Sequence, residues 1–339
     1  MPPLPDTMRA LVLARCAPDY AGCELTQLPV PQPAHTQALV RIRACALGFP
    51  DLLMTRGAYQ HKPELPSVMG GEMAGEVVAV GEGAHDIAVG DAVVGGGLFG
   101  GQGGGFAEYG AYDADALRPI PAGLDAAHAA ATGSAYLTAY VALVRRAALK
   151  AGEWVLIHGA AGGVGLAAVD LARHLGARVI ATAADADKRA ILEAEYRPDA
   201  ILDPRDGFRE TVKELTDGRG ADVIYDPVGG DICDESIRCI AWGGRLLIIG
   251  FAGGRIADIP SNMPLIKGFS VVGVRAGEYG RRHPEEGREN LEAVWTLAGA
   301  GKITPRVHAC LPLENWRDAF AEMDTRKVVG RVIIAPEAT

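Results

Sequence analysis

The chain has 339 residues, 49% of them hydrophobic, and a formal net charge of −9 at pH 7. Its length favours two domains, and its negative charge argues against a general binder of nucleic acid or of anionic membranes, because both need a positive surface. No apolar run is long enough to span a bilayer, and the six cysteines are scattered without a C-x-x-C pair, so we expect reduced thiols in a cytoplasmic protein.

The first third of the sequence predicts irregular, mostly β structure. Alternating segments such as residues 38–44 and 75–80 are short and bounded by Gly or Pro, the pattern of half-buried strands. Residues 95–105 are very rich in glycine and predict a loop.

Strands and helices alternate from Trp154 onward. We predict strands at residues 154–157, 178–182, 200–202, 222–225, 245–249 and 269–274. We predict helices at residues 163–175, 187–195, 208–215 and around 232–240. This alternation is typical of a doubly wound α/β domain, with a parallel sheet covered on both faces. Helices at 290–298 and around 314–323 and a strand at 329–334 follow, so the α/β domain interrupts a β-rich one.

The strongest motif is H-G-A-A-G-G-V-G at residues 158–165. It follows a predicted strand and opens a predicted helix, the context that a dinucleotide-binding turn requires. Gly162 lets the backbone approach a pyrophosphate, and Gly165 lets the helix pack against the strand. The N–H groups and dipole of the helix favour the phosphates. An ordinary tight connection is the alternative, but the strand–turn–helix context favours binding. The turn residues assigned to the cofactor are Ala161, Gly162, Gly163 and Val164.

The end of the second strand distinguishes NAD from NADP. NAD-binding proteins usually carry an Asp or Glu there for the ribose 2′-hydroxyl, whereas this strand ends in A-T-A-A at residues 181–184. Lys188 and Arg189 follow, and either could meet a 2′-phosphate. Asp185 and Asp187 count against NADP, since an acid repels the phosphate. We predict NADPH, with Ala184 and Lys188 in its site.

Several motifs together resemble the zinc-free quinone oxidoreductase branch of the medium-chain dehydrogenase/reductase superfamily. They include A-A-G-G-V-G at 160–165, D-L-L-M-T-R-G-A-Y at 51–59, D-P-V-G-G at 226–230 and K-V-V-G-R at 327–331. The resemblance implies a GroES-like β-rich domain (residues 1–132 and 278–339) and a Rossmann domain (133–277). It also implies a homodimer joined through the edge strand at 269–274, a strand whose free edge would otherwise invite aggregation.

The zinc enzymes of that superfamily hold a catalytic zinc with Cys, His and a second Cys or Asp. Here the first ligand position falls near Phe49 and Pro50, and the G-H-E motif is replaced by G-G-E at residues 70–72. Zinc needs about three protein ligands, and none of the eight histidines lies in a ligand-spaced cluster. We therefore predict no metal site and interpret Glu72 as a structural acid.

The resemblance also implies roles for residues outside the turn. Tyr59 would lie near the nicotinamide and donate a hydrogen bond to the acceptor oxygen, unless it is a packing tyrosine. Thr138 would contact the nicotinamide, unless its hydroxyl bonds its own helix backbone. Relatives place an Asn where this sequence has Gly48. The strand-end residues expected on the cofactor side are Val228, Gly250, Phe251, Val272 and Val274.

The expected activity is NADPH-dependent reduction of a quinone. Without a Lewis acid an alcohol is hard to oxidise, whereas a quinone or conjugated carbonyl accepts hydride at carbon and spreads the charge onto oxygen. A 2-enoyl-thioester or enone reductase would need only the same step. A third possibility is an NADPH-binding protein with little turnover. The expected partner is a small conjugated carbonyl or quinone substrate, with no nucleic acid and no membrane.

Overall fold

The computed structural model describes residues 3–96 and 104–336, so the predicted glycine-rich loop at 95–105 falls mostly outside the described residues. The chain divides into two compact units, Met1–Gly133 with Pro305–Thr339, and Ser134–Thr304. We call them unit 1 and unit 2. Helix α2 (Ala126–Tyr140) runs through the boundary between them. In the described part of the chain, no helix is both long and apolar enough to cross a membrane.

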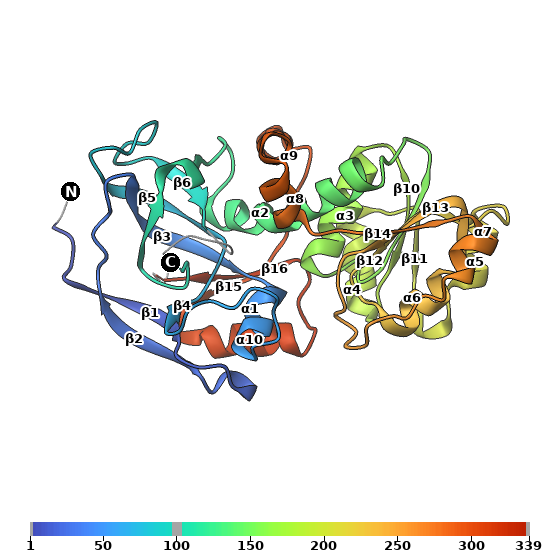
Figure 1. Cartoon of the computed structure of the whole chain (residues 1–339), viewed down its shortest axis with the longest axis horizontal. Helices are drawn as coiled ribbons and strands as arrows, with labels where there is room; N and C mark the ends of the chain where they lie inside the picture. The colour runs from blue at the N-terminus through green and yellow to red at the C-terminus, as the bar shows by residue number, and fades with distance from the viewer. Residues whose placement is uncertain (1–2, 97–103, 337–339) are drawn as a thin grey trace. The chain divides into compact units, whose positions relative to one another are not determined.

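Unit 1 is built on two sheets (Figure 1). A three-stranded sheet has the order β2-β1-β4, and a larger one has the order β15-β16-β3-β5-β6-β8, with β7 pairing with β3. The smaller sheet contains β1 (Thr7–Leu13), β2 (Cys23–Pro29) and β4 (Ser67–Val68). The larger contains β3 (Gln37–Leu47), β5 (Met73–Val80), β6 (Ala92–Gly95), β7 (Tyr109–Asp113), β8 (Arg118–Pro119), β15 (Val307–Pro312) and β16 (Arg331–Ala335). Pairing is antiparallel except between β15 and β16.

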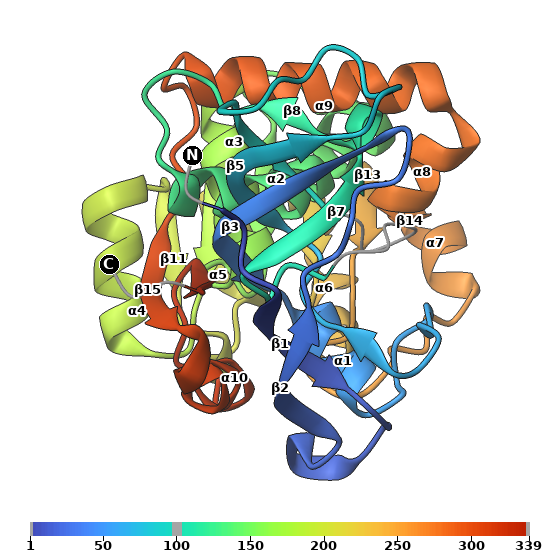
Figure 2. The same ribbon diagram turned by 90° about the vertical axis from the view of Figure 1, so that its left-hand side faces the viewer.

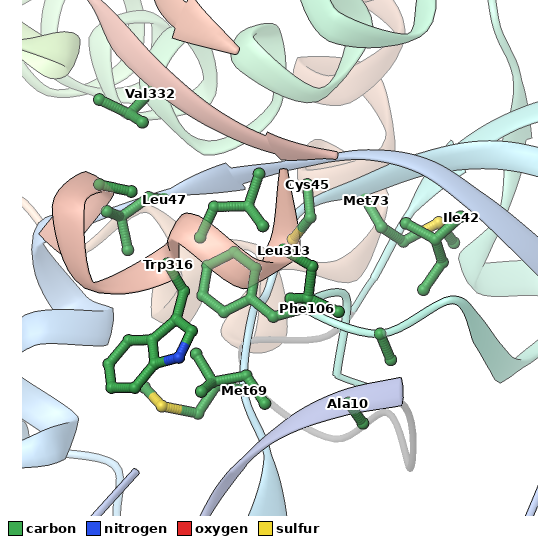
Figure 3. Close-up of a cluster of buried hydrophobic side chains, with 14 of the residues drawn as sticks. Ala10, Ile42, Cys45, Leu47, Met69, Met73, Phe106, Leu313, Trp316 and Val332 are labelled. Carbon is green, nitrogen blue, oxygen red and sulfur yellow. The ribbon is translucent and has the colours of Figure 1, made fainter. Parts of the chain in front are cut away.

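A dense apolar cluster lies in unit 1 (Figure 3). Helix α10 (Trp316–Asp324) contributes Trp316 and Phe320, whose rings meet edge to face with centroids 5.5 Å apart. Phe320 also meets Phe106, which is fully buried, at a centroid distance of 6.1 Å. Burying each such side chain stabilises the fold by about 1.5–3 kcal/mol. The cluster also contains Met8 and Leu11 of β1, and α10 lies near the end of the chain (Figure 2), so the cluster joins the two ends of the chain. Helix α1 (Phe49–Thr55) follows β3 directly.

Unit 2 contains a six-stranded parallel sheet of order β11-β10-β9-β12-β13-β14. The strands are β9 (Trp154–Ile157), β10 (Arg178–Thr182), β11 (Ala200–Leu202), β12 (Ala221–Asp226), β13 (Ile240–Ile248) and β14 (Ser270–Gly273). The helices are α3 (Gly163–His174), α4 (Ala186–Ile191), α5 (Arg209–Leu215), α6 (Gly230–Ser236), α7 (Asn262–Lys267), α8 (Ala276–Arg282) and α9 (Pro284–Gly299). The order reverses at β9, which confirms the predicted doubly wound sheet and makes the carboxyl end of β9 the place for a ligand.

Three of the predicted boundaries in unit 2 are wrong. The helix predicted around 232–240 ends at Ser236, and β13 already begins at Ile240 rather than at residue 245. Gly243 has a φ of +73°, so a glycine kink interrupts the first part of β13 and hides its strand pattern. The helix predicted at 290–298 begins earlier, at Pro284, because proline suits the first helical turn.

The predicted domain boundary at 277/278 differs from that of the compact units, which lies at 304/305. Helix α9 belongs to unit 2 because Arg145 Nε donates to Asn290 Oδ1 at 2.7 Å. Helices α8 and α9 also approach closely, since a Cβ on Gly287 would lie 2.8 Å from the Cα of Gly280. Farther along, the Thr304 N–H donates to Asp170 at 2.6 Å. These contacts keep the chain on unit 2 until Thr304.

Candidate dinucleotide site

The turn after β9 is hydrogen-bonded to both neighbouring strands, β12 and β10. The N–H of His158 donates to the carbonyl of Tyr225 on β12, and the N–H of Ala160 donates to the carbonyl of Thr182 on β10, each at 3.0 Å. Within the turn, Gly162 N–H donates to the Gly159 carbonyl at 3.0 Å, and Gly159 has a φ of +55°. Backbone bonds therefore hold the turn in place from both sides.

The glycines of the turn have the properties that a pyrophosphate site needs. A Cβ on Gly165 would lie 2.2 Å from the Gly159 carbonyl oxygen, so only glycine allows α3 to start this close to β9. Gly162 is the exposed N-cap of α3, and the N–H groups of the first helical turn have no acceptor within the helix. Ala161 is buried, whereas Gly163 and Val164 are half-buried. These residues fit the phosphates of a dinucleotide.

His158 is fully buried beneath the turn and joins two further elements. Its Nδ1 lies 3.1 Å from Thr182 Oγ1, and its Nε2 lies 2.8 Å from Ser236 Oγ on α6. The Ser236 hydroxyl donates to the carbonyl of Ile232, so it accepts from His158, and this bond assigns the proton to Nε2. Burial lowers the pKa of His158 to about 4, and the charge of Asp226 opposes that shift. The sequence motif alone gave no indication of this network.

The residues predicted at the strand ends lie at the carboxyl edge of the sheet. Asp226 Oδ1 accepts the N–H groups of Val228 and Gly229 at 2.8 and 2.9 Å, which turns the chain after β12. Val228 Cγ2 is 3.4 Å from the Cβ position of Gly159, and Gly250 N–H donates to the Asp226 carbonyl at 3.4 Å. Phe251 follows, half-exposed.

Val272 lies on β14, the last strand of the sheet, and Val274 follows directly after it. Val272 pairs with Leu247 of β13, and the Val274 N–H donates to the carbonyl of Ile248 at 3.0 Å. Strand β14 is three strands from β9 in the sheet, or roughly 14 Å at ordinary strand spacing. The structure therefore brings Val228 to the turn, while the role of the two valines at the nicotinamide stays a prediction.

The loop after β10 is occupied by basic side chains. Asp185 caps α4 by accepting the N–H of Lys188 at 3.1 Å, and burial lowers the pKa of the Lys188 amine. Ala184 is exposed, and its carbonyl accepts from Arg189 at 2.8 Å and from Arg205 at 2.5 Å. Arg205 was missed in the sequence, because it follows the third strand and nothing in its local pattern points to the loop after the second.

The two predicted catalytic residues lie in different units. Tyr59 is half-buried in the bend that follows α1 in unit 1, and Thr138 is half-buried in the part of α2 that belongs to unit 2. Their roles stay predictions.

A buried polar cluster occupies the part of unit 1 where the zinc ligands were sought. Arg331 pairs with Glu72, and Asp51, only 2% exposed, accepts the N–H of Gly48 at 2.8 Å. Burial raises the pKa of Asp51 to about 7, and the pKa of the neighbouring Cys45 thiol is raised by burial as well. Among the described residues, no group of three or more His, Cys, Asp or Glu side chains is arranged to hold a metal ion.

Comparison with known proteins assigns each of the two units to a known domain family. Residues 34–122 match the alcohol dehydrogenase GroES-like domain, and residues 163–296 match the zinc-binding dehydrogenase family. A quinone oxidoreductase-like protein 2 homologue from Nematostella vectensis is 40% identical over 302 residues, covering 88% of this chain and 81% of that protein. The chain belongs to the quinone oxidoreductase branch of the medium-chain dehydrogenase/reductase superfamily. This oxidoreductase thus has a GroES-like domain and a Rossmann domain for a nicotinamide cofactor, as its sequence predicts.

Two further matches bear on cofactor and substrate. The solved structure of a mycobacterial protein complexed with NADPH superposes on this medium-chain reductase with a TM-score of 0.87 and 31% identity, covering 97% of this chain and 100% of that one. A mycoketide-CoA synthase of Mycobacterium tuberculosis is 40% identical over 299 residues, which cover 88% of this chain but 7% of the synthase.

Proposed function

We propose that the protein is an NADPH-dependent quinone reductase that transfers hydride without zinc. The observation that carries this proposal is the turn at 158–165, whose glycines fit a pyrophosphate and whose neighbouring strand β10 ends without an acid. The NADPH complex of a structural relative supports the choice of cofactor. Phe49 and Pro50 at the first ligand position, and Gly71 in place of the ligand histidine, support the metal-independent step.

The chain's own residues would bind and orient the cofactor. Residues 161–164 would hold the pyrophosphate, and Ala184 and Lys188 would lie at the adenosine ribose. The nicotinamide half would lie toward Val228, Gly250, Phe251, Val272 and Val274. NADPH supplies a hydride when bound, and Thr138 would contact the nicotinamide. Tyr59 would donate a hydrogen bond to the acceptor oxygen, where negative charge develops as the acceptor is reduced.

A conjugated acceptor suits a site without a metal. A quinone needs no deprotonation before it accepts hydride, so the protein mainly positions the reactants and excludes water. The same reasoning covers an enone or a 2-enoyl thioester. The match to a mycoketide-CoA synthase favours keeping this second activity as the alternative.

Steady-state assays with a panel of acceptors test the proposal. We expect NADPH oxidation with 1,4-naphthoquinone and 9,10-phenanthrenequinone that exceeds the rate with crotonyl or acryloyl thioesters. Faster thioester reduction would favour the alternative. Tight NADPH binding without turnover of any conjugated acceptor would indicate a binding protein. Elemental analysis accompanies the assays, and one zinc per chain would contradict the metal-independent mechanism.

We also propose that the enzyme is a cytoplasmic homodimer paired through β14. This strand ends the sheet, and Ser270, Val271 and Gly273 are exposed on it. Trp242 and Leu265, each 80% exposed, add a large apolar surface to unit 2. An uncovered apolar edge of this kind invites pairing with another chain, and a two-fold axis would satisfy both copies at once.

A further inference from the structure

We infer that Arg205 binds the 2′-phosphate of the cofactor and sets the preference for NADPH over NADH. This inference rests on the proposed NADPH dependence and names the residue that enforces it. The supporting contacts lie within unit 2, at the carboxyl ends of β10 and β11. That is where dinucleotide-binding proteins of this topology recognise the ribose next to the adenine.

The guanidinium of Arg205 is held in place from two sides. Its Nη2 donates to the Ala184 carbonyl at 2.5 Å and to Asp203 Oδ2 at 2.6 Å. Its Nε donates to Asp203 Oδ1 at 3.0 Å, so the side chain is fixed against the loop although it is 68% exposed. Within residues 3–96 and 104–336, the Nη1 of Arg205 donates no hydrogen bond. Because Asp203 takes the Nε and Nη2 side of the guanidinium, Nη1 is the part held ready to donate to a phosphate.

Asp203 cannot take the place of the missing NAD-type acid. Its Oδ1 accepts from the N–H and Nε of Arg205, and its Oδ2 accepts from Arg205 Nη2 and from Arg189 Nη1 at 2.9 Å. A carboxylate offers about four acceptor positions, so none is left for a ribose hydroxyl. The hydrogen bonds from Arg205 hold the pKa of Asp203 well below its ordinary value, and the carboxylate stays ionised and paired.

Arg189 lies beside Arg205 but is more buried and bonds mainly to the backbone of the loop. Its Nη1 donates to the carbonyls of Ala183 and Ala184 as well as to Asp203, and its side chain is only 28% exposed. It therefore supports the loop from within, while Arg205 presents its surface to solvent. The two guanidiniums share the Asp203 carboxylate, and the carboxylates of Asp185 and Asp206 also act on Arg205. Phosphate binding would therefore depend on the N–H groups of Arg205 Nη1 and not on a surplus of positive charge.

The test measures the dissociation constants of NADPH, NADH and adenosine 2′-monophosphate by calorimetry on the whole protein. We expect Arg205→Ala to weaken NADPH and adenosine 2′-monophosphate about tenfold and to leave NADH within about twofold. Arg205→Lys should lie between, because it keeps the charge and loses the fork. Arg219→Ala is the matched control. It removes an arginine whose side chain is 59% exposed, at the amino end of β12 and so away from the carboxyl ends of β10 and β11, and it should change none of the three constants.

The outcomes separate this inference from the proposed function. If the parent protein binds NADPH and NADH equally well, the proposed cofactor preference fails and this inference fails with it. If the parent prefers NADPH but Arg205→Ala keeps that preference, only this inference is overturned. Equal weakening of NADPH and NADH would also overturn it, because Arg205 would then support the loop rather than read the phosphate. If Arg219→Ala weakens NADPH binding as much as Arg205→Ala does, the effect comes from net charge, and a specific contact between Arg205 and the phosphate is ruled out.

Discussion

The carbonyl oxygen of Gly159 lies 2.2 Å from the point that a Cβ of residue 165 would occupy. Gly165→Ala must therefore shift α3 or the turn, because real Cβ contacts are never this short. We expect a loss of about 1–3 kcal/mol in the free energy of unfolding and a large loss of NADPH affinity. Gly162→Ala is the control for stability, since its Cβ would meet the nearest atom at 3.4 Å. Urea unfolding should show little change in that variant. If the two variants have the same free energy of unfolding, the close approach of α3 to the turn does not depend on glycine at position 165.

The variant Glu72→Ala should lower the free energy of unfolding of unit 1 strongly. Its partner Arg331 is buried, and breaking a buried pair by deleting one member typically costs about 3–5 kcal/mol. The control is Glu76→Ala, which breaks the exposed pair with Arg43 at 3.4 Å and should cost less than about 1 kcal/mol. Chemical denaturation of both variants measures the difference. Similar costs for the two would show that the Glu72–Arg331 pair is not desolvated.

Asp51 should make stability fall as the pH rises. Its pKa is raised by burial from 3.8 to about 7, so the folded state favours the protonated acid. The contribution is present in full below pH 4 and is lost between about pH 4 and pH 7, with an upper limit of about 4 kcal/mol. Asp51→Asn keeps the acceptor for Gly48 and should remove this loss. The measurement is the difference in unfolding free energy between parent and variant across this range, and a constant difference would contradict the assignment.

His158 should stay neutral in every ordinary assay. Its pKa is lowered by burial from 6.5 to about 4, so its contribution to stability is present above pH 6.5 and is lost as the pH falls toward 4. Nitrogen NMR should show a single tautomer with the proton on Nε2 and no titration between pH 5 and 8. His158→Leu should cost about 1–3 kcal/mol, because the polar groups of Thr182 and Ser236 lose their partner. A ring that titrates near pH 6.5 would show that the network is open to water.

The edge strand β14 should govern assembly. Val271→Lys places a charge on the exposed edge, and we expect it to convert the proposed dimer to a monomer. Light scattering after size-exclusion chromatography gives the mass directly. Leu25→Lys offers a matched control, since Leu25 is an exposed apolar residue of β2 in unit 1. A dimer that survives Val271→Lys would place the interface elsewhere.

The sequence predicted the parallel sheet better than the rest of the fold. The strands at 154–157, 178–182 and 200–202 were predicted with the bounds that the structure has, and β9 is buried along its whole length. A strand covered on both faces appears in the sequence as a continuous apolar run, so it can be recognised without knowing which strands lie beside it. Strand β15 was missed because its residues are mostly half-buried and it pairs in parallel with β16 over a bulge.

The side-chain partnerships of the site could not be predicted in this way. Glu72 and Arg331 lie 259 residues apart, and no local pattern links them. Arg205 meets the carbonyl of Ala184 only because β10 and β11 are neighbours in the sheet. The turn at 158–165 was recognised because its function depends on glycines next to one another in the chain. Pairing across the sheet depends instead on which strands become adjacent.

Gly48 leaves room for a side chain next to the buried pair of Arg331 and Glu72 and the carboxyl of Asp51. Its backbone is extended, with φ −114° and ψ 159°, so residues of any type can adopt the conformation. A first side-chain carbon there would lie 3.3 Å from Pro50 Cδ, 3.4 Å from Asp51 Oδ2 and 3.7 Å from Arg331 Nη2, so it fits once Pro50 shifts by a few tenths of an ångström. Protein engineers could therefore introduce a hydroxyl, an amide or a methyl group at a single codon and measure how the buried polar cluster responds, without redesigning the scaffold.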